Sequence, residues 1–335
     1  MSKQAKFVRP GEKMFDIEGE PFPKGAWWWW FWLFFLDNPK DPAKSRQLMI
    51  LWSTKNVKEI DCNGLKIKLK LPFDRKKIDG AVAAWYFDGE KMHHNFLLEQ
   101  CKIAVSEDGL KTDSKVPTSF TIRDLASRVR IGDRFDLVAE AKEGPDFLRP
   151  TYHANHYLSG KGYAITRINR LGLKGIVDGK PVKGTAYLQR VFVNAPAVPW
   201  YWGIFHFENG AALTYTNQMV LGKALKKRII FFDGREMREL NDMAVRRVGG
   251  KIPEFKISGE TAEYKASFTV RCYEHSSWTF KKKSLGMIPN KLVYNEYPAV
   301  IDDFEFLDKK TGKRTTSKEL GKAVGNAEHT TGYLF

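Results

Sequence analysis

The chain has 335 residues, of which 43% are hydrophobic and 28% charged, proportions that are typical of a globular protein and exclude a disordered one. Two domains of ordinary size could each bury a core at this length. Its three cysteines, Cys62, Cys101 and Cys272, are too few and too far apart for a disulfide framework or a zinc ribbon. No apolar segment follows the basic residues of the N-terminus, so we expect no signal peptide and a cytoplasmic protein.

The net charge is +16, from 55 lysine and arginine residues against 39 acidic ones. Basic residues are spread along the chain, with denser runs at 223–251 and 281–283. No familiar nucleic-acid recognition motif accompanies them, so we do not expect a nucleic-acid partner. Two interpretations stay open. The lysines form solvated strand faces, or they attract the protein to an anionic membrane surface, where it would be peripheral and where an apolar substrate would reside.

The first predicted element is an aromatic strand over residues 27–36, with the sequence WWWWFWLFFL. It is too short to span a bilayer, which takes about 20 apolar residues. Successive residues of a strand face opposite sides, so both faces are aromatic and both should be covered. One face could pack a core or a partner module while the other lines a cavity. A purely structural core and an exposed carbohydrate-binding platform are the alternatives.

The rest of the chain has strong β signals and weak helical ones. The segment 65–71, LKIKLKL, alternates strictly and predicts a half-buried strand. Asp-Gly or Asn-Gly pairs, which supply the positive φ angles of tight hairpins, lie between convincing strands at 88–89, 178–179 and 209–210. Short helices are conceivable only at 122–129, 239–248 and 317–324. The predicted fold class is therefore all-β, antiparallel, with little helix.

An aromatic phrase related to the first, WYWGIFHF, occupies residues 200–207, about half a chain later, and both phrases run into a turn. This repeat predicts two related β-modules, each with its aromatic strand in an equivalent position. A glycine-rich break at 159–162 lies about midway between them. We place the domains at 1–160 and 161–335.

Three stretches resemble lipocalin-like proteins of the AttH and carotenoid 1,2-hydratase (hydroxyneurosporene synthase) group. They are the tryptophan-rich opening at 26–31, VDGKPVKGTAYL at 177–188, and the WYW…NG…LTY pattern across 200–215. The order and spacing fit over residues 26–218. The resemblance implies two lipocalin-like β-barrels or half-barrels packed together, an apolar pocket and no organic cofactor. It also implies an enzyme that hydrates, isomerises or cyclises a large isoprenoid- or polyketide-like molecule.

The chain departs from the hydratases at one place. Where they carry an Asp-His pair, and then a tryptophan three residues past the aspartate, this chain has Gln189-Arg190 and Phe192. An arginine is no general acid near neutral pH. Arg190 could instead hold a carboxylate or phosphate head group. A non-catalytic carrier or binder of a hydrophobic molecule, and a structural protein with filled barrels, are therefore the competing functions. A titratable group facing the cavity would favour the enzyme.

We predict that the ligand lies against tryptophans that recur in both modules, with Arg190 and Tyr152 as further binding residues; the tryptophans are Trp28, Trp30, Trp200 and Trp202. Three residues are candidates for the proton-transfer step. His94 and His206 each lie in an apolar strand face, where burial can move a histidine pKa across neutrality, and Tyr215 follows in the next strand. A hydrogen-bonded core histidine is the alternative for His206.

We expect no metal site. The pairs His93-His94 and His153/His156 would point to opposite sides of a regular strand, and no cysteine has ligand spacing. Phosphate-binding loops, dinucleotide fingerprints and nucleophile elbows are absent from the sequence.

Overall fold

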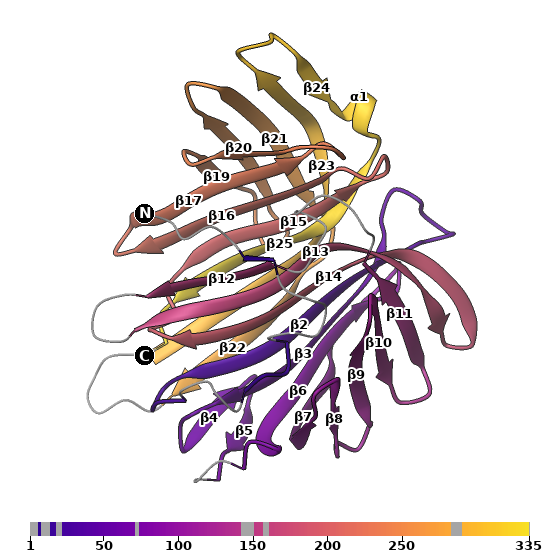
Figure 1. Cartoon of the computed structure of the whole chain (residues 1–335), viewed down its shortest axis with the longest axis vertical. Coiled ribbons are helices and arrows are strands. Elements are labelled where there is room, and N and C mark those ends of the chain that lie inside the picture. The colour runs from indigo at the N-terminus through magenta and orange to yellow at the C-terminus, as the bar shows by residue number, and fades with distance from the viewer. Residues whose placement is uncertain are drawn as a thin grey trace.

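The computed structural model describes residues 6–7, 14–17, 22–70, 74–141, 151–156, 161–282 and 290–334. These residues form two antiparallel sheets with almost no helix, as the sequence predicts (Figure 1). The one helix within these ranges is α1 (Ser317–Leu320), a single turn closed by a capping box between Thr316 and Glu319. It is far too short to cross a membrane.

The first sheet contains a closed barrel of ten strands. Its ring runs β13-β11-β10-β9-β8-β7-β6-β3-β2-β14, and the β13–β14 pair closes it. The short β1 and β12 extend this sheet beside β13. The bounds are β1 (Lys6–Phe7), β2 (Trp27–Leu36), β3 (Arg46–Lys55), β6 (Lys77–Phe87), β7 (Met92–Val105), β8 (Gly109–Thr112), β9 (Thr118–Arg123), β10 (Ala126–Ile131), β11 (Phe135–Glu140), β12 (Thr151–His156), β13 (Gly162–Val177) and β14 (Lys180–Asn194).

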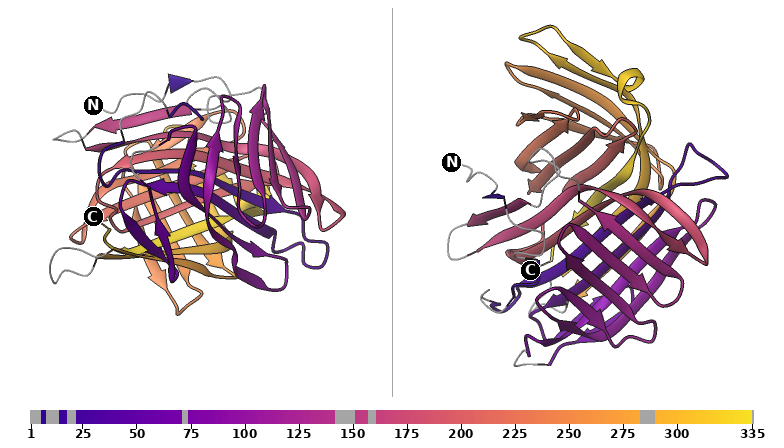
Figure 2. Two further views of the ribbon diagram at one scale, coloured as in Figure 1. Left: turned by 90° about the horizontal axis from the view of Figure 1, so that it is seen from below. Right: turned by 45° about the vertical axis from the view of Figure 1, so that its right-hand side comes forward.

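The second sheet follows the path β18-β17-β16-β15-β25-β23-β21-β20-β19, with β22 and β24 paired to β23. The β4–β5 hairpin from the N-terminal part of the chain joins it through β22. The bounds are β4 (Glu59–Cys62), β5 (Leu65–Lys68), β15 (Trp200–Phe207), β16 (Ala212–Val220), β17 (Lys223–Phe232), β18 (Met237–Leu240), β19 (Ala244–Val248), β20 (Glu254–Glu260), β21 (Tyr264–Cys272), β22 (Ser276–Lys282), β23 (Asn290–Asp308), β24 (Arg314–Thr316) and β25 (Ala323–Gly332). Figure 2 shows the two sheets side by side.

Two of the three conceivable helices are wrong. Residues 122–129 form parts of β9 and β10, and residues 239–248 form parts of β18 and β19. Residues 126–131 alternate between buried and less buried positions, whereas residues 244–248 are mostly exposed, so in the second segment it is pairing with β17 and β20 that decides against a short helix. The alternation predicted at 65–71 is confirmed where the structure describes it, since Ile67 is buried between exposed Lys66 and Lys68. Residues 71–73 and the glycine-rich break at 159–160 lie outside the described ranges.

The strands change from the first sheet to the second between Asn194 and Trp200, while β4 and β5 belong to the second sheet despite their early position. The division into 1–160 and 161–335 concerns folding units and stays a prediction. The three largest apolar clusters among the described residues hold the molecule together. One fills the barrel, one lies on the inner side of the second sheet, and one lies between the two sheets.

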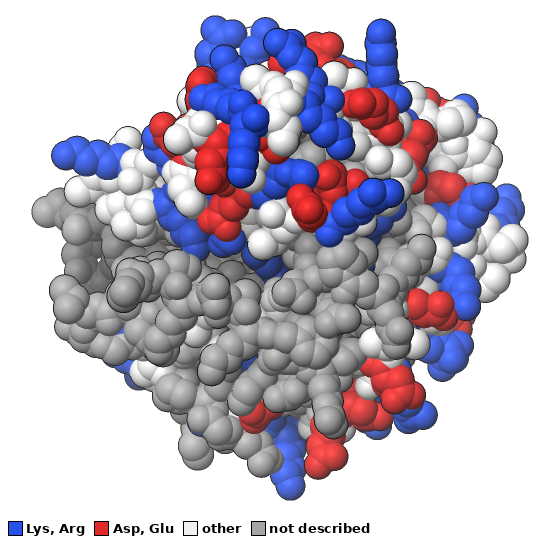
Figure 3. Space-filling view, turned by 45° about the horizontal axis from the view of Figure 1, so that its top comes forward, with Lys and Arg blue, Asp and Glu red and all other residues white. Residues whose placement is uncertain are grey.

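Exposed basic side chains are interleaved with acidic ones. Arg128 is paired with Asp136 at 2.5 Å, and Arg134 with Asp178 at 2.6 Å, both on barrel hairpins. Figure 3 shows lysine and arginine side chains among carboxylates over the upper part of the face in view. This mixture is what solvated strand faces look like, and exposed pairs of this kind contribute little to stability.

Candidate functional site

The two sheets enclose a cavity of about 1150 Å³, which we call the intersheet cavity. It is larger than many small-molecule sites, which run from roughly 300 to 1,000 Å³. Its walls come from β2, β13 and β14 on one side and from β15, β16, β17 and β25 on the other. Four tryptophans of the two aromatic strands line it, namely Trp27, Trp29, Trp200 and Trp202.

The cavity lies where the two sheets diverge. At one end of the aromatic strands the sheets are in contact, because the ring of His206 meets Phe35 at 5.1 Å and its nitrogens bond to β13 and β14. At the opposite end, around Trp27 and Trp200, the space between the sheets is open. Residue alternation then gives each aromatic strand one face toward its own core and one toward the other sheet.

Glu328 of β25 is the acidic group in the cavity wall among the described lining residues. It is 4% exposed. The indole Nε1 of Trp200 donates a hydrogen bond to its Oε2 at 2.8 Å, and the hydroxyl of Tyr294 donates to its Oε1. Burial raises the pKa of Glu328 above the ordinary glutamate range, more strongly than these two donors lower it. The result is an oriented carboxyl group that can exchange a proton near neutral pH.

A second buried carboxyl group stands beside the first. Glu296 of β23 is directly opposite Glu328 in the antiparallel register, so both side chains project from the same face. Its Oε2 accepts hydrogen bonds from the Nε1 atoms of Trp85 at 2.8 Å and Trp278 at 2.9 Å. Burial and the charge of Glu328 both raise the Glu296 pKa, so the pair retains a proton that isolated glutamates would have lost.

Basic residues line another part of the cavity. Arg167 of β13 and Arg228 of β17 come from opposite sheets, and the charge of Arg167 contributes to lowering the Arg228 pKa, after burial as the larger cause. Arg228 is paired with Glu239, and Lys226 donates to the Tyr163 hydroxyl at 3.1 Å. Arg167 interacts with Tyr187 and has no carboxylate partner in the part of the chain that the structure describes. The positive charges of these side chains would attract an anionic group of a ligand.

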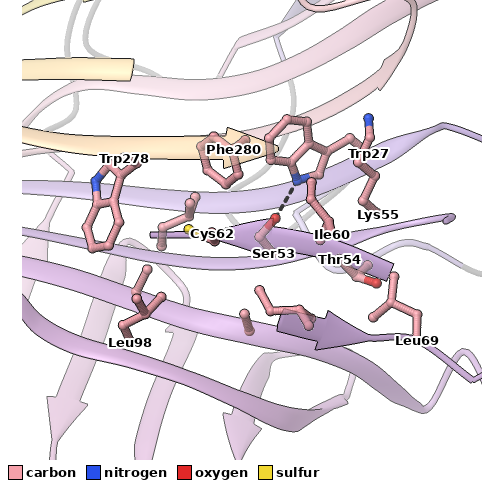
Figure 4. Close-up of a pocket in the computed structure, with 14 residues that line it drawn as sticks. Trp27, Ser53, Thr54, Lys55, Ile60, Cys62, Leu69, Leu98, Trp278 and Phe280 are labelled. Atoms are coloured by element: carbon pink, nitrogen blue, oxygen red, sulfur yellow. Dashed lines mark hydrogen bonds between the residues drawn. The ribbon is translucent and has the colours of Figure 1, made fainter. Parts of the chain in front are cut away.

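A smaller void lies behind Trp27, between the β4–β5 hairpin and the barrel (Figure 4). Its volume is about 30 Å³, close to the space of one water molecule, so it cannot hold a large ligand. The indole Nε1 of Trp27 donates to Ser53 Oγ at 2.5 Å, and Lys55 Nζ lies 4.7 Å from the Trp27 ring centre. Burial, helped by the charge of Lys282, lowers the Lys55 pKa to about 7. These contacts fix the orientation of Trp27.

The structure divides the four tryptophans predicted to bind the ligand. Trp200 and Trp202 line the intersheet cavity. Trp28 and Trp30 lie on the opposite face of β2, inside the barrel, where Trp28 stacks on Phe22 and the Nε1 of Trp30 donates to the Met14 carbonyl at 2.7 Å. Trp27 and Trp29, instead of Trp28 and Trp30, line the cavity.

The other buried candidates lie away from the cavity lining. His206 is fully hydrogen-bonded, since its Nε2 donates to the Asn169 carbonyl at 2.7 Å and its Nδ1 accepts from Thr185 Oγ1 at 2.8 Å. Burial holds its pKa well below the usual range, so the ring is neutral. Tyr215 packs in the apolar cluster on the inner side of the second sheet, and burial there raises its pKa. Arg190 lies opposite Trp30 in the strand register, on the barrel side of β14, whereas its neighbour Gln189 lines the cavity.

His94 and Tyr152 lie elsewhere on the barrel. His94 is exposed, with its Nδ1 3.4 Å from Ser276 Oγ. A register shift opposite Trp85 breaks the alternation of β7, so Phe96 and Leu97 both pack on the barrel core and the apolar face expected around His94 does not form. Tyr152 is half-buried on β12. The side chains of His153 and His156 are outside what the structure describes. Among the described residues no three His, Cys, Asp or Glu side chains are grouped as metal ligands would be.

Glu328, Glu296 and Tyr294 are not predicted from the sequence. Glu328 lies in AVGNAEHTTG, a segment with two glycines and few strand-forming residues, which nevertheless forms β25 between β15 and β23. Its place in the middle of a sheet is decided by those neighbours. Two buried glutamates at the same level of adjacent strands leave no local trace in the sequence.

Comparison with solved structures finds this fold in other proteins. A Nitrosomonas europaea protein assigned as an AttH has 13% identity and a TM-score of 0.51, over 95% of this chain and 99% of its own. CghA has 10% identity and a TM-score of 0.53, over 98% of this chain and 93% of its own. At these identities the similarity shows the fold, and it supports the predicted AttH-like, lipocalin-like architecture. The sequence matches no protein-family model and no curated protein.

Proposed function

We propose that this protein is an enzyme that binds a large apolar molecule, isoprenoid- or polyketide-like, in the intersheet cavity and hydrates, isomerises or cyclises it by proton transfer. The observation that carries the proposal is Glu328, a buried carboxyl group with a raised pKa in the wall of an aromatic cavity. Tryptophan walls offer large apolar contact with few rotatable bonds, so a bound ligand would be ordered at small entropic cost.

The proposed step needs only this chain, its ligand and, for hydration, one water molecule. Protonated Glu328 transfers its proton to a carbon–carbon double bond, and the electron pair of that bond forms the new C–H bond. The positive charge left on the neighbouring carbon would lie beside the aromatic wall to which Trp200 and Trp202 contribute, and aromatic rings stabilise cations. Loss of a proton from an adjacent carbon to the Glu328 carboxylate isomerises the ligand, and bonding of a water oxygen to the cation followed by loss of its proton to Glu328 hydrates it. For cyclisation, the electron pair of a second double bond of the ligand bonds to the cation before an adjacent carbon loses its proton. Each route restores the acid.

The residues around Glu328 have positioning roles in this scheme. The Tyr294 hydroxyl and the Trp200 Nε1 hold its two oxygens, so the carboxyl group keeps one orientation. Burial raises the Tyr294 pKa well above its usual range, and Tyr294 therefore remains a hydrogen-bond donor throughout. Arg167 and Lys226 would hold an anionic end of the ligand, the role that the sequence assigns to Arg190.

The test compares molecules extracted from wild-type protein and from Glu328→Gln, both purified from the native host, by chromatography and mass spectrometry. We expect an apolar molecule in each. The molecule taken from Glu328→Gln should be converted by wild-type protein into the one that wild-type protein carries. Glu328→Gln should catalyse this conversion about 10²–10⁴-fold more slowly, the usual share of a general acid. Glu305→Gln, an exposed glutamate paired with Arg314, is the matched control and should act as wild type.

Two outcomes would contradict the enzyme. If both proteins carry the same molecule and neither alters it, the protein is a carrier. If Glu328→Gln converts the molecule at the wild-type rate, Glu328 is not the acid.

A further inference from the structure

The β16–β17 hairpin carries the two most exposed large apolar side chains among the described residues. Leu221 is 84% exposed and Leu225 is 57% exposed. Both also line the intersheet cavity, so they stand at its opening. Single exposed leucines are ordinary, but two on one hairpin at the mouth of an apolar cavity form a local apolar patch. We call Val220, Leu221 and Leu225 the hairpin patch.

The backbone at Leu221 makes the patch more unusual. Three hairpins of this protein turn through two residues with the same left-handed geometry, at 63–64, 178–179 and 221–222. The first residue has φ of 49° in each case, and it is Asn63, Asp178 and Leu221 respectively. Asparagine and aspartate tolerate this conformation because their short polar side chains bond locally, whereas leucine is disfavoured there. Leu221 thus occupies a position that costs turn stability and gains no burial in return.

The hairpin is nevertheless held in place. The Leu221 amide donates to the Tyr333 hydroxyl at 3.1 Å, and the Met219 amide donates to the Pro199 carbonyl at 2.9 Å. The strand register shifts between Gln218 and Met219, and Leu225 is the unpaired residue on the other strand. This bulge re-aims Leu225. The exposed leucines are therefore features of an anchored hairpin. In Figure 1, β16 and β17 lie next to each other in the second sheet, beside β15.

Lysines accompany the patch. Lys223 follows the turn and is exposed, and Lys161 is exposed at the cavity lining. Lys226 lies one residue beyond Leu225. The described lining residues include four cations, Lys161, Arg167, Lys226 and Arg228, against the single carboxylate of Glu328, which is buried. Apolar tips flanked by lysines match a bilayer surface, where leucines enter the acyl boundary and lysines meet anionic head groups.

We propose that the hairpin patch docks on an anionic lipid surface and so places the opening of the intersheet cavity against the membrane. An apolar ligand could then pass between bilayer and cavity without crossing water, whose contact with apolar surface is unfavourable. Unlike the enzymatic role of Glu328, this proposal requires no chemistry in the cavity. The two can fail separately, because Glu328→Gln should bind vesicles as wild type does.

The test is co-sedimentation of the purified full chain with vesicles of phosphatidylcholine alone and of equal parts phosphatidylcholine and phosphatidylglycerol. We expect binding to the anionic vesicles that weakens as salt rises, since the attraction of lysines is screened. Leu221→Asn should reduce the vesicle partition coefficient about tenfold or more, because burying one leucine side chain is worth at least that factor. Lys223→Gln should reduce it about fivefold.

The Leu221→Asn variant also separates docking from folding. Asparagine suits the φ of this turn, so its thermal unfolding midpoint should stay equal or rise while vesicle binding falls. Ile176→Asn is the matched control, because Ile176 is 43% exposed on the β13–β14 hairpin and does not line the cavity. It should bind vesicles as wild type does. The proposal is overturned if wild-type protein fails to bind anionic vesicles, or if Leu221→Asn binds them as tightly as wild type.

Discussion

The two faces of β2 show that the same residue type can build a filled core or an open cavity. The even-numbered aromatics from Trp28 to Phe34 enter the barrel, where Trp32 stacks on Phe34 at 5.1 Å and meets Phe120 edge-on at 5.2 Å. The odd-numbered Trp27 and Trp29 face the second sheet and line the intersheet cavity. One step along the strand separates these roles. What differs is whether opposing side chains reach far enough to fill the space.

Closure of the ring explains the filled side. Ten strands direct their inner residues toward one axis, so each large side chain meets several others and close packing follows. The other face of β2 is opposed by one sheet only. That sheet contacts it near Phe35 and His206 and leaves space near Trp27 and Trp200.

The largest loss of stability should come from removing a side chain on the barrel face of β2. Trp30→Ala removes a fully buried indole from the barrel and breaks its bond to the Met14 carbonyl, so we expect about 3–5 kcal/mol of destabilisation in denaturant unfolding. Trp29→Ala, its half-buried neighbour on the cavity face, should cost clearly less. Equal losses for the two variants would show that both faces are core.

Trp202→Ala should weaken ligand binding more than it lowers the stability of the fold. The Trp202 ring lies 5.3 Å from Tyr187 and borders the cavity, so its removal enlarges a space that already exists. We expect roughly tenfold weaker retention of the extracted apolar molecule in native mass spectrometry, with a smaller stability loss than for Trp30→Ala. Unfolding of the protein with unchanged ligand retention per folded molecule would identify Trp202 as core.

The buried pair Glu296 and Glu328 should make the stability of the protein depend on pH. The pKa values of Glu296 and Glu328 are raised on folding, so the folded protein binds more protons than the unfolded chain above about pH 4.3. Their contribution to stability is complete below that pH and is lost as pH rises through the raised values. The free energy of unfolding should therefore fall as pH rises between about pH 5 and 8.

Glu296→Gln should flatten this dependence. The amide is neutral at every pH, and it also relieves Glu328 of a charged neighbour. Glu305→Gln, at an exposed site, should leave the slope unchanged. A Glu296→Gln variant with the wild-type slope would show that the pair does not govern the pH response.

The sequence predicts much of the fold but less of the site. The all-β class, the aromatic strands and the hairpins at 178–179 and 209–210 follow from residue alternation and turn chemistry, both of which are local. Trp200 and Trp202 are predicted at a cavity and lie there. The sequence shows that both faces of β2 are aromatic, but it cannot tell which face packs in a core. The sequence therefore assigns the ligand to Trp28 and Trp30, whereas the structure places these in the barrel core and Trp27 and Trp29 at the cavity.

By itself the sequence determines the strands, because alternation, aromatic content and glycine turns act over a few residues. Only the tertiary structure decides which strand faces meet. The pairing of β25 with β23 brings Glu328 beside Glu296 from segments about 30 residues apart, and the divergence of the two sheets leaves the cavity open. It also shows that Leu221 stands at the cavity opening. These outcomes depend on long-range register and sheet packing, which no short stretch of sequence encodes.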